Sequence, residues 1–182
     1  MAAAPDSARD ARLAALGQDL VRVAYLQGHF VLRSGAVSSY YFDKYRFETQ
    51  PALLRRVAAC LAERIPPGTQ RLAGPELGAV ALAAAVSLEL DLPFVIVRKA
   101  QKEYGTTAKF EGELQAGERV TMIEDVVTSG GAALDSVRAL RQAGAVVEDV
   151  IAVVDREEGG AAALGAEGLR FDPLFRRTQL DL

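Results

Sequence analysis

The chain has 182 residues, half of them hydrophobic and a quarter charged, which predicts one globular domain with a substantial core. A net charge of −3 argues against a general nucleic-acid or membrane-surface role, and no run reaches the roughly 18 apolar residues of a membrane span. The single cysteine, Cys60, excludes an intramolecular disulfide and a cysteine metal cluster. Nothing in the first residues reads as a signal peptide, so we expect a cytoplasmic protein.

The first predicted element is a helix over about residues 6–25, because Leu13, Leu16 and Leu20 recur near helical spacing. Gly28 is its expected end, since glycine commonly terminates helices. The only histidine, His29, follows directly, and we expect it to be structural rather than catalytic.

The helical spacing of apolar residues then stops, and residues 30–32 and 38–42 predict two strands of a hairpin around a turn at 33–36. Arg33 lies on this turn, and Tyr41 and Phe42 stand side by side in the second strand. Strand aromatics are usually core and arginine is usually solvated. A planar anionic ligand would nevertheless fit a flat apolar face beside a cation.

The next helix is predicted over residues 49–65, capped by Thr49, with Pro51 in its first turn and Cys60 facing inward as a small hydrophobe. A short strand ending at Ala73 leads into a glycine loop at 74–78 and an alanine-rich helix to about residue 90. This strand–loop–helix unit offers free amide groups at the helix start, although many such turns look alike.

An apolar strand at 93–97 is followed by a polar loop, R-K-A-Q-K-E-Y-G-T-T, at 98–107. Arg98, Lys99 and Lys102 place three cations in five residues, which would contact a polyanion such as pyrophosphate well. A solvated basic loop is the alternative interpretation.

The most informative stretch is 120–133, V-T-M-I-E-D-V-V-T-S-G-G-A-A. Glu124 and Asp125 are expected where a buried strand ends, and a small turn at 128–131 opens a helix that runs to Gly144. A glycine turn at a helix N-terminus favours a phosphate. The two acids would repel a phosphate unless they hold sugar hydroxyls or a metal ion. A ribose 5-phosphate satisfies both parts of the stretch, with its hydroxyls at the acids and its phosphate at the turn. An ordinary strand–turn–helix link with a solvated acid pair is the alternative.

Another buried strand, at 146–154, ends in the charged run D-R-E-E-G-G at 155–160. Arg156 lies where doubly wound sheets place their ligands, unless it simply pairs with its acidic neighbours. A short helix at 161–168 and a last strand at 169–171 complete the pattern.

Alternating strands and helices predict an α/β fold with a mostly parallel central sheet flanked by helices. We expect one domain over residues 1–182. Residues 1–48 and the C-terminal strand would form a small hood over an α/β core at about 49–160.

Residues 120–133 resemble the phosphoribosyl-pyrophosphate (PRPP) binding motif of type I phosphoribosyltransferases: a hydrophobic strand, two acids, two variable residues, then Thr, a small residue and Gly. The resemblance implies that Glu124 and Asp125 hold the ribose hydroxyls, and that the glycine loop at 74–78 is the pyrophosphate loop. It also implies a 5-phosphate site made by Val126, Val127, Thr128, Ser129, Gly130 and Gly131.

Three further runs resemble the orotate phosphoribosyltransferases: F-V-L-R-S-G-A-V-S-S-Y-Y-F-D at 30–43, R-K-x-x-K-x-x-G at 98–105 and D-R-x-E-x-G at 155–160. The resemblance implies PRPP contacts from Arg98, Lys99, Lys102 and Tyr104. It implies catalytic roles for Lys99, Lys102 and Asp125, and an orotate site made by Arg33, Tyr41, Phe42, Thr128 and Arg156. Two positions depart from the common pattern, because Arg33 stands where Lys is frequent and Tyr104 where His is frequent.

The resemblance further implies a homodimer whose basic loop closes over the neighbouring subunit, and Mg²⁺ held mainly through PRPP. The expected reaction transfers ribose 5-phosphate to orotate in pyrimidine synthesis. A purine phosphoribosyltransferase, a PRPP-binding regulator without catalysis and a plain structural α/β domain are the alternatives.

Overall fold

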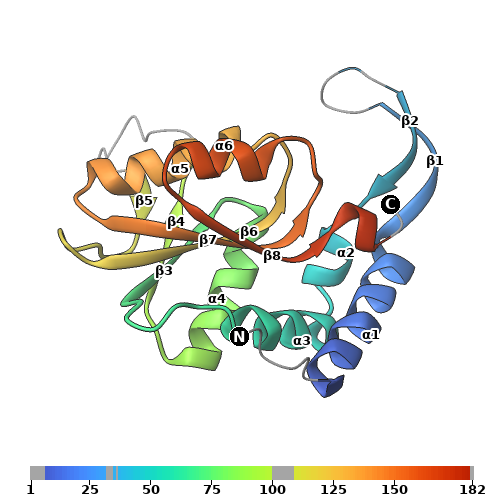
Figure 1. Ribbon diagram of the computed structural model, residues 1–182, viewed down its shortest axis with the longest axis horizontal. Helices are drawn as coiled ribbons and strands as arrows, with labels where there is room; N and C mark the ends of the chain where they lie inside the picture. The colour runs from blue at the N-terminus through green and yellow to red at the C-terminus, as the bar shows by residue number, and fades with distance from the viewer. Residues whose placement is uncertain (1–6, 32–34, 36, 100–108, 181–182) are drawn as a thin grey trace.

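A six-stranded sheet forms the centre of the computed structural model, which describes residues 7–31, 35, 37–99 and 109–180 (Figure 1). The strand order is β5-β4-β3-β6-β7-β8, and every neighbouring pair is parallel except β4 and β5. The predicted α/β class with a mostly parallel sheet is therefore confirmed. The strands are β3 (Arg71–Pro75), β4 (Phe94–Val97), β5 (Phe110–Glu111), β6 (Arg119–Val127), β7 (Val146–Asp155) and β8 (Arg170–Arg176).

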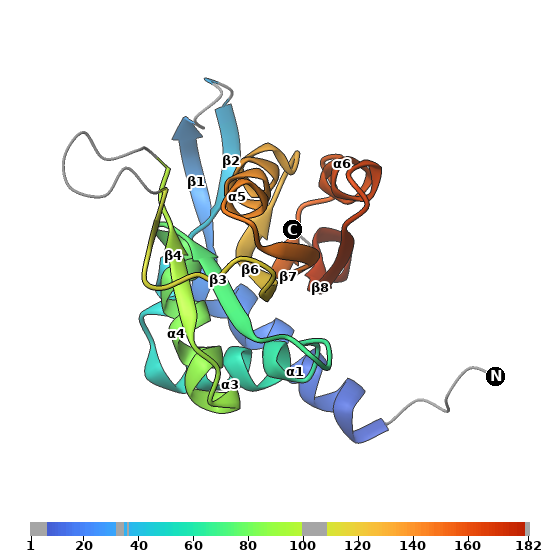
Figure 2. The same ribbon diagram turned by 90° about the vertical axis from the view of Figure 1, so that its left-hand side faces the viewer.

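Helices cover both faces of this sheet, and Figure 2 shows α3 and α4 on one side with α5 and α6 on the other. The helices are α1 (Ser7–Ala24), α2 (Tyr45–Glu48), α3 (Pro51–Ala62), α4 (Gly78–Leu90), α5 (Gly131–Gln142) and α6 (Gly160–Ala166), with a 3₁₀ turn η1 (Arg177–Gln179) after β8. Among the described residues, no helix combines the length and apolar character that crossing a membrane requires.

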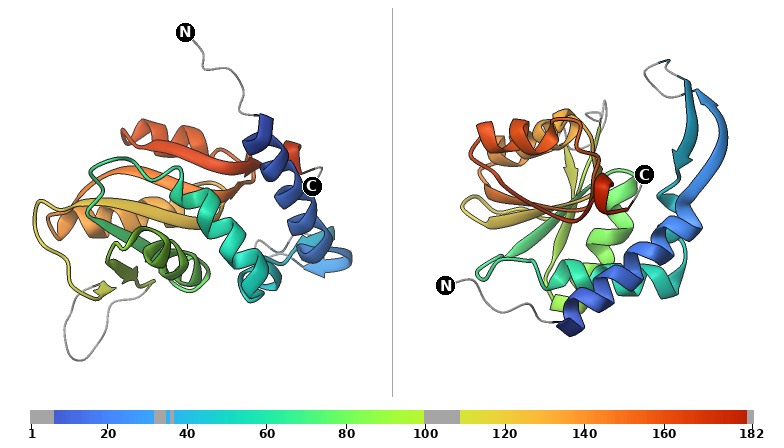
Figure 3. Two further views of the ribbon diagram at one scale, coloured as in Figure 1. Left: turned by 90° about the horizontal axis from the view of Figure 1, so that it is seen from below. Right: turned by 45° about the vertical axis from the view of Figure 1, so that its right-hand side comes forward.

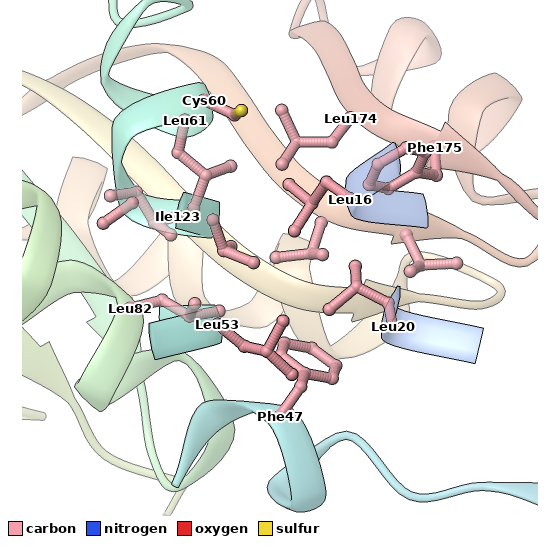
Figure 4. Packing of buried hydrophobic residues seen from close by; sticks show 14 of the residues in the cluster. Leu16, Leu20, Phe47, Leu53, Cys60, Leu61, Leu82, Ile123, Leu174 and Phe175 are labelled. Atoms are coloured by element: carbon pink, nitrogen blue, oxygen red, sulfur yellow. The ribbon is translucent and has the colours of Figure 1, made fainter. Parts of the chain in front are cut away.

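Successive strand residues face opposite sides of the sheet, so each strand contributes to two cores. Leu72 of β3 and Ile123 of β6 pack with α1, α3 and α4, whereas Ala73 and Met122 pack with α5 and α6. Figure 4 shows Leu16 and Leu20 of α1 meeting residues of α3 and β8 in the first core. Cys60 lies in this core at 2% exposure, which confirms its expected role as a small buried hydrophobe.

The predicted hairpin is present as β1 (Tyr25–Val31) and β2 (Val37–Phe42), and it projects away from the sheet (Figure 3). The helix predicted over about residues 6–25 is confirmed as α1, but Gly28 does not terminate it, because α1 stops at Ala24. Tyr25 instead stacks on Tyr40 across the hairpin, with ring centroids 5.5 Å apart, so cross-strand pairing starts earlier. Gly28 lies where the strand register shifts, a position that suits glycine.

Two other expectations need correction. The C-terminal strand does not join a hood: β8 pairs in parallel with β7 at the edge of the main sheet, where Leu174 and Phe175 are buried against the α1 core. Thr49 does not cap α3, because its hydroxyl donates to the Tyr45 carbonyl at 2.6 Å and closes the short helix α2. The α3 N-cap is Gln50.

Candidate active site

A cavity of about 390 Å³ opens at the carboxyl ends of the central strands. The chain leaves β3 towards β4 on one side, and later returns to β6 on the other side of β3. Such a switch point leaves a crevice between two neighbouring strand ends, where open α/β sheets bind their ligands. Residues 75–78, 97–99 and 124–128 bring the ends of β3, β4 and β6 into its wall.

The acid pair lies inside the last part of β6 rather than after it, because the ladder with β7 continues to Val127. Glu124 and Asp125 both line the cavity, at 8% and 3% exposure. Burial, reinforced by the neighbouring Asp125 charge, raises the pKa of Glu124 to about 8. In the empty site at neutral pH, Glu124 is therefore mostly protonated, which relieves the repulsion expected between two adjacent carboxylates.

Sequence reasoning missed Lys44, which forms an ion pair with Asp125 and lines the same cavity. The two side chains are 29% and 5% exposed. Burial is the largest single influence and lowers the pKa of the Lys44 ammonium. The charge and hydrogen bond of Asp125, with smaller contributions from Tyr45 and Glu48, together raise that pKa above its usual value. Its neighbours in the sequence gave no signal, because no helix was expected directly after it and its partner lies far along the chain.

Sequence reasoning also missed Glu48, a buried acid at 4% exposure that lies close to the Lys44–Asp125 ion pair. Burial first, and then the charge of Asp125, raise the pKa of Glu48 to about 8. Among the described residues its Oε1 atom has no hydrogen-bond partner. Lys44 thus pairs with Asp125, and the two acids nearby, Glu48 and Glu124, both have raised pKa values.

Gly78, the first residue of α4, makes room for the ion pair. A Cβ at this position would collide with the Asp125 carboxylate and lie 2.7 Å from Lys44 Nζ. The preceding Glu76–Leu77 peptide bond is cis. The absence of a side chain at Gly78 therefore brings the start of α4 into contact with the acid pair.

The turn after β6 ends at Gly130, the N-cap of α5, whose φ of 83° favours glycine. A Cβ on Gly130 would lie 3.2 Å from the Gly160 backbone, so the turn packs closely against the start of α6. Of the residues predicted to hold a 5-phosphate, Val126, Val127, Thr128 and Gly130 line the cavity. Ser129 and Gly131 are exposed beside them at the start of α5.

Of the basic loop at 98–107, only residues 98 and 99 are described. The Arg98 amide donates to the Lys109 carbonyl at 2.8 Å, and the Lys99 amide donates to the Glu76 carboxylate at 2.8 Å. The Arg98 guanidinium lies 3.3 Å from a Glu111 oxygen. Arg98 and Lys99 both line the cavity. Lys102, Tyr104 and Arg33 lie outside the described residues.

Arg156 follows β7 directly and is not among the residues that line the cavity. Its amide, however, donates to the carbonyl of the lining residue Val127 at 2.8 Å, and its side chain faces the hairpin. Its guanidinium lies 5.9 Å from the centre of the Tyr40 ring, donates to the Tyr40 hydroxyl at 3.5 Å and lies 3.3 Å from Glu158. Among the described residues its buried Nε has no hydrogen-bond partner. Tyr40, which sequence reasoning did not single out, is therefore a hairpin residue that Arg156 contacts.

The two aromatic residues expected beside orotate take different places. Tyr41 is 43% exposed and lies 5.6 Å from the Phe30 ring on the outer hairpin. Phe42 is 6% exposed and packs against Phe47 in the core, so it supports the hairpin from beneath rather than lining the cavity. Its burial does not suit direct contact with a base.

A family model described as the phosphoribosyl transferase domain matches residues 46–163, so the chain belongs to the phosphoribosyltransferase class. The orotate phosphoribosyltransferase of Methanocella arvoryzae is 48% identical over 153 residues, which cover 84% of this chain and 87% of the relative. That of a Nocardioides species is 48% identical over 168 residues, covering 92% and 94%. The chain therefore belongs to the orotate phosphoribosyltransferase family.

A solved structure agrees with this membership. Mycobacterium tuberculosis orotate phosphoribosyltransferase in complex with PRPP superposes with a TM-score of 0.78 at 29% identity, covering 94% of this chain and 99% of that one.

Proposed function

We propose that this protein transfers the 5-phosphoribosyl group of PRPP to N1 of orotate, giving orotidine 5-monophosphate and pyrophosphate in pyrimidine nucleotide synthesis. The observation that carries the proposal is the cavity at the switch point. It joins a buried acid pair suited to a diol with a glycine turn at a helix N-terminus suited to a phosphate.

In this reaction the bond between C1 of the ribose and the pyrophosphate oxygen breaks, and its electron pair leaves with pyrophosphate. N1 of orotate forms the new bond to C1 and loses its proton to pyrophosphate or solvent. Positive charge develops on the ribose and negative charge on the leaving group, so catalysis rests mainly on positioning and charge stabilisation. Glu124 and Asp125 would accept hydrogen bonds from the ribose hydroxyls, and Asp125 would also face the developing positive charge.

Arg156 supplies the orotate end of the site. A guanidinium binds a carboxylate through two parallel N–H donors, and the buried Nε of Arg156 is a donor without a partner among the described residues. A purine phosphoribosyltransferase would have no substrate carboxylate for this donor. This difference favours orotate over the purine alternative.

The Mg²⁺ requirement and the homodimer belong to the proposal as well. Mg²⁺ usually binds substrate phosphates and keeps several of its waters. Because the described residues include no group of three His, Cys, Asp or Glu side chains placed to hold a metal ion, the ion would be held mainly through PRPP. The ion would neutralise charge on pyrophosphate. We infer the cytoplasm as the site of action.

Sharing of the basic loop between subunits can be tested by mixing two inactive variants. Heterodimers of Lys102→Ala with Asp125→Asn should recover part of the activity if one subunit supplies the loop and the other the acid pair. Confirmed heterodimers without recovery would contradict sharing.

The decisive experiment follows orotate consumption by its ultraviolet absorbance with PRPP and Mg²⁺, in parallel with adenine, hypoxanthine and uracil. We expect turnover of orotate alone. Turnover of a purine instead would contradict the assignment of Arg156, and PRPP binding with no turnover of any base would favour a regulator.

A further inference from the structure

Four cations line the described part of the cavity, and one of them is placed differently from the rest. Arg98 is held by its acidic neighbours, and Lys99 and Lys109 are exposed at the two ends of the basic loop. Lys44 comes instead from the hairpin side and is anchored on a buried carboxylate. The glycine loop at 74–78, G-P-E-L-G, carries no cation of its own.

Lys44 Nζ lies at the first turn of α4, since a Cβ on Gly78 would come within 2.7 Å of it. The N-terminus of this 13-residue helix carries partial positive charge, so it adds to the ammonium. Two positive features at one point favour an anion. In the empty site that anion is Asp125.

The same Asp125 oxygen that accepts from Lys44 lies in the pair expected to hold the ribose hydroxyls. A bound ribose would compete with Lys44 for this carboxylate, and the displaced ammonium would need another anionic partner. C1 of PRPP is bonded to C2, so its pyrophosphate lies next to the hydroxyls that displace Lys44. The nearest new partner is therefore the phosphate group attached to C1.

We propose that Lys44 is a further catalytic residue, which leaves Asp125 when PRPP binds and contacts the leaving pyrophosphate. This inference rests on the proposed phosphoribosyl transfer. The oxygen that receives the electron pair of the broken C1–O bond gains a fixed positive neighbour, and Lys44 keeps its proton throughout. The exchange also frees the Asp125 carboxylate to face the ribose as its positive charge develops.

The test compares two ligands that differ at C1: PRPP, and ribose 5-phosphate, which lacks the pyrophosphate. Calorimetric titration of Lys44→Met should show PRPP affinity at least about tenfold weaker, while ribose 5-phosphate binds as well as to wild type or better. Binding is retained or improved because Asp125 is no longer paired with an ammonium. In the assay, kcat should fall on the order of 100-fold, as for loss of one donor to a developing anion.

The matched control is Arg46→Met, which removes the same charge from an exposed position two residues further on, within α2, and should leave both affinities and kcat unchanged. Lys44→Arg keeps the charge but changes the length and shape of the side chain, so it should lower kcat while retaining ribose 5-phosphate binding. If Lys44→Met does not fold, Lys44→Arg replaces it in the test.

Equal losses of affinity for both ligands in Lys44→Met would mean that Lys44 only supports the site, and an unchanged kcat would exclude the catalytic role. The binding comparison needs no turnover. If wild type bound PRPP but did not consume orotate, the proposed function would fail while the Lys44 exchange could still be measured.

Discussion

The acid pair and the glycine turn at the end of β6 lie within one run of eight residues, 124–131, whereas Arg156 meets Tyr40 across 116 positions of sequence. The first region is made by one strand, one turn and one helix start, and its charges are buried. The second is made by side chains from a projecting hairpin and a strand end, and the Arg156 side chain is 22% exposed.

This difference implies different sensitivities. Charges in the buried region interact strongly and leave little room for adjustment, so small displacements there should reduce turnover. The contacts between hairpin and Arg156 are longer and partly solvated, so changes there should affect which base binds more than how fast the bond to pyrophosphate breaks.

The largest effect that we expect at the buried end comes from Gly78→Ala. The added methyl group would displace the Asp125 carboxylate or Lys44, and a displacement of about 1 Å can lower the rate roughly 100-fold. Overpacking should also cost about 1–3 kcal/mol of unfolding free energy. Steady-state kinetics with PRPP and urea unfolding measure the two effects.

Gly165→Ala is the matched control, because a Cβ there meets nothing within 4 Å and the residue lies in α6. It should leave activity unchanged and stability equal or slightly higher. Similar activity in both alanine variants would show that the start of α4 can move away from the acid pair at little cost.

In the second region, where the hairpin meets Arg156, the largest effect should come from Arg156→Met. Losing a charged partner of a carboxylate costs about 2–5 kcal/mol, so KM for orotate should rise roughly 100-fold while KM for PRPP changes little. The KM of Arg156→Lys for orotate should lie between those of wild type and Arg156→Met, because lysine keeps the charge but lacks the planar guanidinium. An equal rise in KM for orotate and for PRPP would contradict the assignment of orotate to Arg156 and of PRPP to the buried region.

The residue patterns predicted the parallel α/β core because each strand and helix is a contiguous run with its own period. The strand–acid–turn–helix unit around Asp125 could be recognised for the same reason. The position of β8 was not predictable in this way. Its pairing with β7 and its packing on α1 depend on partners far along the chain.

The missed parts of the site have the same cause. Lys44 lies 81 positions from Asp125, and its sequence neighbours give no sign of a buried partner. The two raised acid pKa values arise from burial, which a sequence does not display. The pair Tyr41 and Phe42 was recognisable as aromatic, but which neighbour meets Arg156 depends on the twist of the hairpin, and that neighbour is Tyr40.

A smaller effect, on stability rather than turnover, is expected from Glu48→Gln. The usual pKa of 4.5 applies in the unfolded chain, while burial and then the Asp125 charge raise the folded value to about 8; Lys44 lowers it and Asp43 raises it further. Between these values the folded protein retains a proton that the unfolded chain has lost. Stability conferred by this proton is therefore complete below pH 4.5 and declines as pH rises towards 8.

Glu48→Gln cannot ionise, so its advantage over wild type in unfolding free energy should grow from near zero at about pH 5 to a few kcal/mol at about pH 9. Urea unfolding without ligand across this range measures it. Glu89→Gln, at an exposed position on α4, should show no such trend. A constant difference between Glu48→Gln and wild type at all pH values would mean that Glu48 is already ionised in the folded protein.

The smallest effect should come from Tyr40→Phe, which keeps the stacked ring and removes only the hydroxyl that accepts from Arg156 at 3.5 Å. A bond of that length is weak, so KM for orotate should rise no more than about twofold. Tyr40→Leu also removes the ring beneath the guanidinium, and a cation–π contact of about 0.5–1 kcal/mol predicts a rise of roughly two- to fivefold. Neither variant should change KM for PRPP. If Tyr40→Phe raised KM for orotate as much as Tyr40→Leu, the hydroxyl rather than the ring would hold Arg156. This region would then depend on a directional hydrogen bond, as the buried region around Asp125 does.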